Sequence, residues 1–168
     1  MDINLIIVAI YSYLLGSIPF GLLLTRIFLK KDIRTVGSGN IGTTNVLRTG
    51  NKFLAITTLA LDLFKGYISV YITIFYFEDL TSLSALICFI GHVFSVFLRF
   101  KGGKGISTLF GVLAVLHLNI GICAASVWLA MFFWKHISSL SGISMLIVLP
   151  WLFLLMPWLK NELDLQVF

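Results

Sequence analysis

The chain alternates long apolar runs with short charged segments, and this alternation restricts its fold more than any other feature. The first run covers residues 3–24 without one acidic or basic side chain. About 20 apolar residues are enough for a helix to cross the hydrocarbon core of a bilayer. Hydrophobic residues make up 59% of the chain and charged residues 11%, whereas soluble domains average about 45–50% and about 25%. We therefore predict an integral membrane protein.

The number of membrane crossings depends on how one long run divides. Later apolar runs cover residues 53–77, 80–98, 106–134 and 141–159. The run 106–134 is long for one span and short for two. A turn at residues 117–119 would make two short helices and return Lys135 to the cytoplasm; we favour this division, which gives six spans, over a single tilted helix, which gives five. The expected fold is an all-α polytopic membrane protein with about five to six spans, in one domain over residues 1–168.

Charge placement predicts how the chain crosses the bilayer. Basic residues lie between the first two runs and after the third, whereas Glu78 and Asp79 lie between the second and third. The positive-inside rule then places the N-terminus outside and both basic segments, with re-entrant or short interfacial helices, on the cytoplasmic face. The first run is too long for the apolar region of a signal peptide, and Asp2 precedes it where a basic residue is usual.

The two cysteines do not indicate a metal site or a disulfide. Cys88 and Cys123 lie inside apolar runs without paired spacing. We expect neither a metal nor a cofactor, and no nucleic acid partner.

A glycine-rich segment, residues 37–50, follows the first run and is named here the serine loop. It contains G-x-G-x-x-G at residues 37–42, but a membrane helix and a charged loop precede it where a dinucleotide fold has a strand. Thr43 stands where a Walker A motif requires lysine. Ser38, Asn40 and Thr43 are good helix N-caps, so we expect a short helix through residues 46–50 with Arg48 one to two turns in.

The serine loop therefore has the composition of an anion site. Glycine-rich turns and helix N-termini direct backbone N–H groups at phosphates, and Arg48 would neutralise the charge. The alternative is an ordinary re-entrant loop whose polar groups bond to its own backbone.

A second basic segment, Lys-Gly-Gly-Lys-Gly at residues 101–105, is named the lysine loop. Its glycines allow a tight curl that could place N–H groups and two ammonium groups on one phosphate. The alternative is a positive-inside anchor with flexible turn glycines.

Three ionisable residues lie inside the apolar runs. Asp62 and Lys65 are spaced i, i+3, and His92 lies further along. Intramembrane charges are functional candidates by default, but an ion pair that fixes helix packing, and a hydrogen-bonded packing histidine, are equally simple interpretations. Residues 16–21, Gly-Ser-Ile-Pro-Phe-Gly, predict a kink and a close helix contact.

These motifs together resemble the bacterial membrane acyl-phosphate:glycerol-3-phosphate acyltransferases of the PlsY type. Four stretches carry the resemblance: residues 16–19, 37–48, 62–66 and 91–105. The likeness extends from the start of the chain to about residue 145. It implies an enzyme of phospholipid synthesis in the bacterial plasma membrane, active on the cytoplasmic face. Its partners would be glycerol 3-phosphate, a fatty acyl phosphate and membrane lipid.

The resemblance also implies residue roles. The catalytic candidates are Ser38, Arg48, Lys104 and Ser139, with Ser138 and Ser141 as alternative registers for the last. The implied phosphate-binding residues are Gly37, Gly39, Asn40, Asn45, Lys101, Gly102, Gly103 and Gly105. Asp62, Lys65 and His92 are supporting candidates. Since the matched residues offer no obvious general base, the phosphate of the acyl donor would accept the proton.

Two departures from the family pattern leave alternatives open. Ser95 stands where the family usually has proline, and a third cytoplasmic motif with His, Asn and Glu has no counterpart near the C-terminus. The chain would then be shortened relative to the family. It could be an inactive homologue that acts as an assembly partner. A transporter of phosphorylated anions, using the same loops as a vestibule, is the other alternative.

A shared phosphate site requires both loops on one side of the bilayer. Reporter fusions after Gly50 and after Lys101 should both report a cytoplasmic location, because basic loops are retained inside. Fusions that report opposite sides would exclude a common site.

Overall fold

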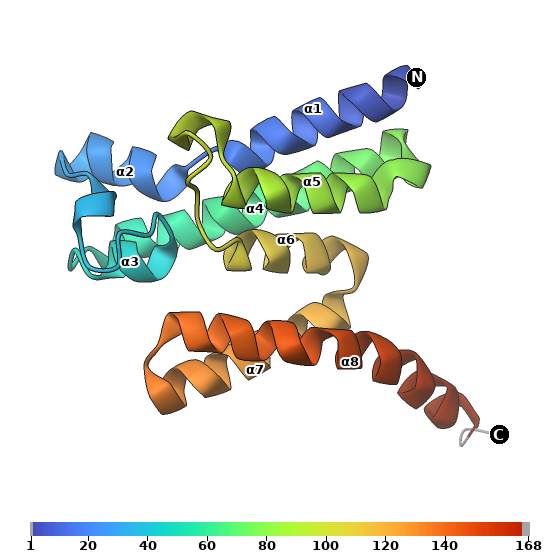
Figure 1. Cartoon of the computed structure of the whole chain (residues 1–168). Coiled ribbons are helices and arrows are strands. Elements are labelled where there is room, and N and C mark those ends of the chain that lie inside the picture. Colours follow the sequence, from blue (N-terminus) through green and yellow to red (C-terminus); the bar gives the residue numbers. More distant parts are fainter. Residues whose placement is uncertain (1, 166–168) are drawn as a thin grey trace. The chain divides into compact units, whose positions relative to one another are not determined.

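The computed structural model describes residues 2–165, with side chains through residue 155. These residues form helices and no strand, so the predicted all-α class is confirmed (Figure 1). The longer helices are α1 (Ile3–Ser17), α2 (Phe20–Leu29), α4 (Lys52–Tyr76), α5 (Thr81–Val93), α6 (Ile106–Leu116), α7 (Leu118–Lys135) and α8 (Ser138–Leu165). The short ones are η1 (Ile33–Thr35), α3 (Thr43–Leu47), η2 (Glu78–Leu80) and η3 (Val96–Leu98).

The chain divides into two compact units, Met1–Leu116 and His117–Phe168. In the first unit, α1 packs on α5, and α4 packs on α1, α5 and α6. In the second unit, α7 packs on α8, and a left-handed residue, His136, ends α7. The expectation of a single domain stays a prediction.

Five described helical segments are long and apolar enough to cross a membrane. Two of them are interrupted by short breaks, and the last two are α7 and α8. The predicted break in the run 106–134 is confirmed at His117, where α6 ends and α7 begins. Helix α6 has only 11 residues, which at about 1.5 Å per residue is roughly half of a bilayer core. Five described segments therefore have the length of a span, and the sixth expected span, α6, is too short by this measure. The single tilted helix over residues 106–134, from which the alternative count of five came, is wrong.

The predicted kink in the first span is confirmed between α1 and α2, at Ile18 and Pro19. Proline cannot donate the hydrogen bond that would continue α1. The glycines on either side allow close contacts. A Cβ at Gly16 would lie 2.0 Å from the Cys88 carbonyl oxygen, and one at Gly21 would lie 1.9 Å from the Ile41 carbonyl oxygen.

Helices α4 and α6 make a reciprocal glycine contact. A Cβ at Gly66 of α4 would lie 2.2 Å from the Thr108 carbonyl oxygen of α6. A Cβ at Gly111 of α6 would lie 1.9 Å from the Leu63 carbonyl oxygen of α4. Because lipid gives helices no hydrophobic reason to associate, such small-residue contacts provide the packing.

Hydroxyl groups hold three helices together inside the first unit. The Ser84 hydroxyl on α5 lies 2.9 Å from that of Ser12 on α1 and 3.0 Å from that of Ser69 on α4. All three side chains are buried. Interhelical hydrogen bonds of this kind contribute about 0.6 kcal/mol each in membranes, so they align the helices more than they stabilise them.

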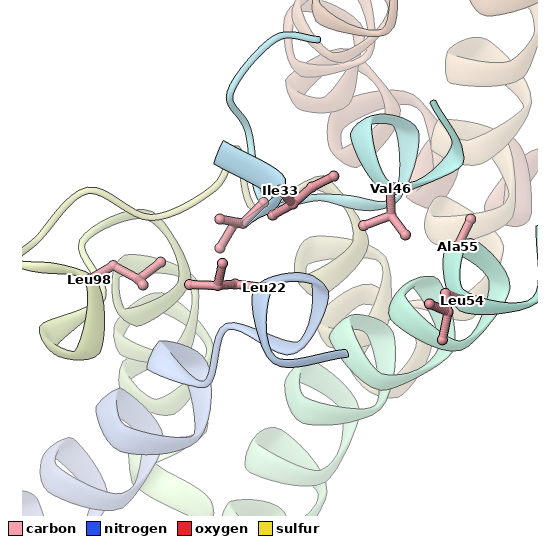
Figure 2. Packing of buried hydrophobic residues seen from close by; sticks show 7 residues of the cluster. Leu22, Ile33, Val46, Leu54, Ala55 and Leu98 are labelled. Carbon is pink, nitrogen blue, oxygen red and sulfur yellow. The ribbon is translucent and has the colours of Figure 1, made fainter. Parts of the chain in front are cut away.

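A buried apolar cluster lies beneath the serine loop (Figure 2). Ile33 of η1, Val46 of α3 and Leu54 of α4 belong to it, together with Leu22 of α2 and Leu98 of η3. The cluster packs the segment that contains η1 and the serine loop against α2, α4 and η3.

Replacing Gly66 with alanine should destabilise the first unit by about 1–3 kcal/mol, because the new methyl group must displace a backbone carbonyl. Thermal unfolding in detergent would measure the loss, and Gly111→Ala should reproduce it from the other side. Gly42→Ala is the control, since a Cβ there meets its nearest atom at 3.9 Å. Equal melting temperatures for Gly66→Ala and Gly42→Ala would contradict the close contact.

Candidate active site

The serine loop folds differently from the expected short helix. Helix α3 begins at Thr43 and ends at Leu47, so the helix expected at residues 46–50 lies earlier in the chain. Gly42, not Ser38, Asn40 or Thr43, is the N-cap residue, and Arg48 is the C-cap. The reason is local: Gly37 and Gly39 take positive φ angles of 53° and 72°, which only glycine adopts without cost, and the chain turns there before the helix starts.

Asn45 organises the serine loop from within. Its amide nitrogen donates to the carbonyl oxygens of Ile33, Val36 and Asn40 at 3.0, 2.9 and 2.7 Å. Its amide oxygen accepts from the Ser38 backbone N–H at 3.0 Å. Asn45 is buried, and its side chain ties α3 to the backbone of the serine loop and of the segment just before it. This arrangement favours the alternative of internal hydrogen bonding for Asn45.

Arg48 lies across the turn at Gly37. A Cβ at Gly37 would come within 2.7 Å of the Arg48 Cδ and 2.6 Å of the Asn45 Oδ1. The Arg48 guanidinium lies 3.5 Å from the same Asn45 oxygen. Arg48, Ser38 and Gly39 are all exposed, whereas Asn40 is half-buried and accepts from the Gly42 N–H at 3.3 Å. The loop thus presents a cation and a hydroxyl at its surface.

The lysine loop uses its glycines for close packing. The N–H groups of Gly102 and Gly103 donate to the carbonyl oxygens of Val93 and His92 at 2.9 and 3.0 Å. The expectation that these two amides face an anion is therefore corrected: they tie the loop to the end of α5. A Cβ at Gly103 would lie 2.2 Å from the His92 ring, and one at Gly105 would lie 2.4 Å from the Phe89 ring.

The two loops, far apart in the sequence, come together through their cations. The side chains of Lys101 and Lys104 are exposed at the surface of the lysine loop. Burial and the nearby charge of Arg48 lower the pKa of Lys104 from the usual 10.5. The contribution from Arg48 indicates that the two loops bring positive charge into one region of the first unit.

The intramembrane ionisable residues form a buried network rather than part of this surface. The Lys65 ammonium lies 2.9 Å from an Asp62 carboxylate oxygen and donates to the Ile18 carbonyl at 2.8 Å. His92 Nδ1 lies 2.9 Å from the Thr108 hydroxyl and 3.9 Å from Asp62. The network connects the α1–α2 break with α4, α5 and α6. It favours the packing interpretation of Asp62, Lys65 and His92.

The candidate catalytic serines differ in how far they are exposed to solvent. Ser139 lies in the first turn of α8, in the second unit, and is exposed, so its catalytic role stays a prediction. Ser141 is buried, and its hydroxyl donates to the Ile137 carbonyl at 3.0 Å. Ser95, which replaces a family proline, donates to the Ser17 carbonyl at 2.5 Å and so ties the start of η3 to the end of α1.

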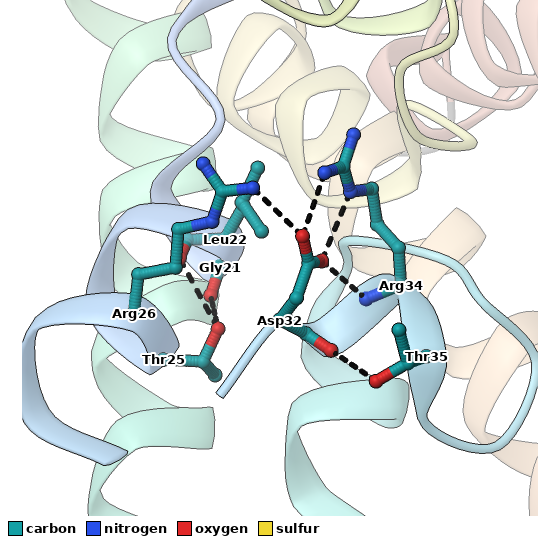
Figure 3. Close-up of polar contacts among 7 residues, drawn as sticks. All are labelled: Gly21, Leu22, Thr25, Arg26, Asp32, Arg34 and Thr35. Atoms are coloured by element: carbon teal, nitrogen blue, oxygen red, sulfur yellow. Dashed lines mark hydrogen bonds and ion pairs between the residues drawn. The ribbon is translucent and has the colours of Figure 1, made fainter. Parts of the chain in front are cut away.

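Sequence reasoning missed an ion-pair cluster just before the serine loop (Figure 3). The Asp32 carboxylate accepts from Arg26 at 2.7 Å and from Arg34 at 2.6 and 2.9 Å. These guanidinium groups hold the pKa of Asp32 well below its usual range, and Asp32 in turn raises the pKa of Arg34. The Asp-x-Arg spacing of Asp32 and Arg34 could have indicated this ion pair from the sequence. In the structure, Asp32 is also the N-cap of η1.

Comparison with known proteins identifies the family. The profile described as "Glycerol-3-phosphate acyltransferase" matches residues 6–168. The chain belongs to the glycerol-3-phosphate acyltransferase family. The predicted resemblance is thus confirmed, and the match extends beyond the residue 145 expected from the motifs.

Individual relatives agree. The glycerol-3-phosphate acyltransferase of Pelagibacter ubique is 48% identical over 145 residues, which cover 86% of this chain and 76% of the relative. That of Erythrobacter litoralis is 52% identical over 146 residues, covering 86% and 74%. The crystal structure of PlsY, an integral membrane glycerol 3-phosphate acyltransferase in its glycerol 3-phosphate form, matches with a TM-score of 0.83 at 35% identity, covering 90% of this chain and 77% of PlsY.

Replacing Asn45 with alanine should loosen the serine loop, since it leaves three carbonyl oxygens and one N–H without their partner. Each buried unsatisfied group costs about 1–3 kcal/mol. Faster proteolysis between Gly37 and Gly50, with a lower melting temperature, would report the change. Asn40→Ala removes a single weak acceptor and is the matched control; an Asn45→Ala variant as resistant as this control would refute the organising role.

Proposed function

We propose that this family member transfers a fatty acyl group from an acyl phosphate to the 1-hydroxyl of glycerol 3-phosphate. The reaction would occur on the cytoplasmic face of a bacterial plasma membrane. The products would be 1-acylglycerol 3-phosphate and inorganic phosphate. The family assignment supports the acyltransferase activity and glycerol 3-phosphate as acceptor. The acyl phosphate donor rests on the motifs of the two loops.

The observation that carries the proposal is the proximity of Arg48 and Lys104. The pKa of Lys104 is lowered first by its partial burial and second by the positive charge of Arg48, and like charges at such close range repel each other. The two substrate phosphates, bound beside these cations, would replace the repulsion with attraction. Such an arrangement is typical of a site built to hold phosphate.

The exposure and hydrogen bonding of the residues support the following roles. Lys104, with Lys101 beside it, holds the phosphate of glycerol 3-phosphate, and Arg48 with Ser38 holds the acyl phosphate and the oxyanion that develops during attack. Asn45 keeps Ser38 and Arg48 in place through bonds to both. Gly37 and Gly39 provide the turn on which Arg48 rests. Gly102, Gly103 and Gly105 seat the lysine loop against α5.

The chemistry requires no cofactor, because an acyl phosphate is a mixed anhydride with an activated carbonyl. The hydroxyl oxygen of glycerol 3-phosphate bonds to the carbonyl carbon, and the bond from that carbon to the phosphate oxygen breaks. The departing phosphate accepts the hydroxyl proton. The protein contributes position and positive charge, since two dianions must approach each other.

Replacing Lys104 with alanine should raise the KM for glycerol 3-phosphate about 10- to 100-fold, as expected for a lost charge-assisted hydrogen bond. The assay would follow phosphate release from palmitoyl phosphate in proteoliposomes. Lys52→Ala removes an exposed cation next to the serine loop and should leave KM unchanged. An unchanged KM in Lys104→Ala would refute the phosphate assignment, and a wild-type chain without turnover would favour the inactive-partner alternative.

The direction of the Lys104 pKa predicts how the reaction responds to pH. A lysine with a lowered pKa loses its charge at a lower pH than a free one, so kcat/KM for glycerol 3-phosphate should fall on the alkaline side before pH 10.5. Lys104→Arg keeps its charge throughout this range and should remove that alkaline fall. The same alkaline fall in both proteins would assign it to another group.

A further inference from the structure

A cavity of about 700 Å³ lies in the first unit, at the α1–α2 break. Its lining combines apolar residues of α2 and η3, among them Leu23 and Phe97, named here the apolar wall, with three arginines, Arg26, Arg34 and Arg99, named the cationic wall. Ligand pockets in proteins occupy about 300–1,000 Å³. The cavity therefore has the size of a ligand site and two kinds of wall, one apolar and one cationic.

The cationic wall carries an excess of positive charge. Asp32 pairs with Arg26 and Arg34 but supplies one carboxylate for two guanidinium groups. Arg99 has no ion pair within the part of the chain that the structure describes. Its φ of 52°, followed by 62° at Phe100, places two adjacent non-glycine residues in the left-handed region. Such a conformation is costly and is retained where surrounding structure or function demands it.

The apolar wall is continuous with an exposed apolar surface. Leu23 and Phe97 are 41% and 58% exposed, and Phe94 and Phe100, which flank η3, are 53% and 60% exposed. Large apolar side chains beside arginines are typical of the level where lipid tails meet headgroups. This exposed apolar surface offers contacts to a ligand that carries an apolar tail.

We propose that the cavity binds a membrane phospholipid with an anionic headgroup. The lipid phosphate pairs with Arg99 and with the excess charge of Arg26 and Arg34, and the first part of its acyl chains lies along Leu23 and Phe97. Neither Arg48 nor Lys104 lines the cavity. The lipid is therefore distinct from the reacting substrates.

The position of this lipid gives it a structural effect on the enzyme. The cavity walls include Arg34, which lies just before the serine loop, and Arg99, which lies just before the lysine loop. Between them lies the α1–α2 break. A phosphate shared by these arginines connects the segments that lead into both loops, so anionic lipid stabilises the first unit without taking part in the reaction.

The test measures lipid binding rather than turnover. The full chain would be placed in nanodiscs of phosphatidylcholine with a small fraction of phosphatidylglycerol, and retained lipid would be counted by native mass spectrometry. Wild-type protein should retain phosphatidylglycerol selectively, and Arg99→Gln should weaken this retention about tenfold, as for a lost charged hydrogen bond. Lys31→Gln is the matched control, since Lys31 is an exposed cation between Arg26 and Arg34 that does not line the cavity.

Two further measurements separate this proposal from its rivals. Leu23→Trp fills the apolar part without removing a cation and should also reduce retention. Equal retention in Arg99→Gln, Leu23→Trp and Lys31→Gln would overturn the proposal. Competition by inorganic phosphate as strong as by phosphatidylglycerol would also overturn it, because no tail would then be needed. Preferential displacement by lysophosphatidic acid would instead make the cavity part of the catalytic site. Because binding is measured directly, failure here leaves the acyltransferase proposal untouched.

Discussion

The rest of the first unit depends on one buried ammonium group. Lys65 is almost fully enclosed, and an unpaired charge in such surroundings is strongly unfavourable. It is paired with Asp62 and with the Ile18 carbonyl, which lies where Pro19 interrupts the first span. The ion pair therefore holds the break between α1 and α2 against α4. This break turns α2 toward the serine loop and shapes the wall of the arginine-lined cavity.

The serine loop and the lysine loop are built in the same way. In each, backbone polar groups are hydrogen-bonded within the protein, and the cationic side chains are exposed. Asn45 satisfies the serine loop from within, and the carbonyls at the end of α5 accept the lysine-loop amides. Both loops are therefore shaped before substrate arrives. Preorganised charge of this kind accelerates acyl transfer because it needs no rearrangement as the oxyanion forms.

Much of the fold was readable from the sequence because membrane spans and their breaks are local signals. Apolar length predicted the long helices, Pro19 predicted the kink, and the turn near His117 was visible as a polar interruption, but the short length of α6 was not foreseen. The directions of the Gly102 and Gly103 amides were not readable, since they depend on carbonyls that α5 places nearby. The predicted start of α3 was too late in the chain, because Gly42 is the N-cap residue rather than Ser38, Asn40 or Thr43, whose side chains are better caps. The role of Asn45 and the meeting of Arg26, Arg34 and Arg99 likewise depend on tertiary contacts.

The contact between Gly103 and His92 has a mechanical consequence. The imidazole touches the lysine loop on one side and the Thr108 hydroxyl of α6 on the other. A displacement of α6 relative to α5 would thus be transmitted through a single rigid ring to the backbone that carries Lys104. The imidazole of His92 therefore acts as a spacer that sets the distance between α6 and the backbone of the lysine loop.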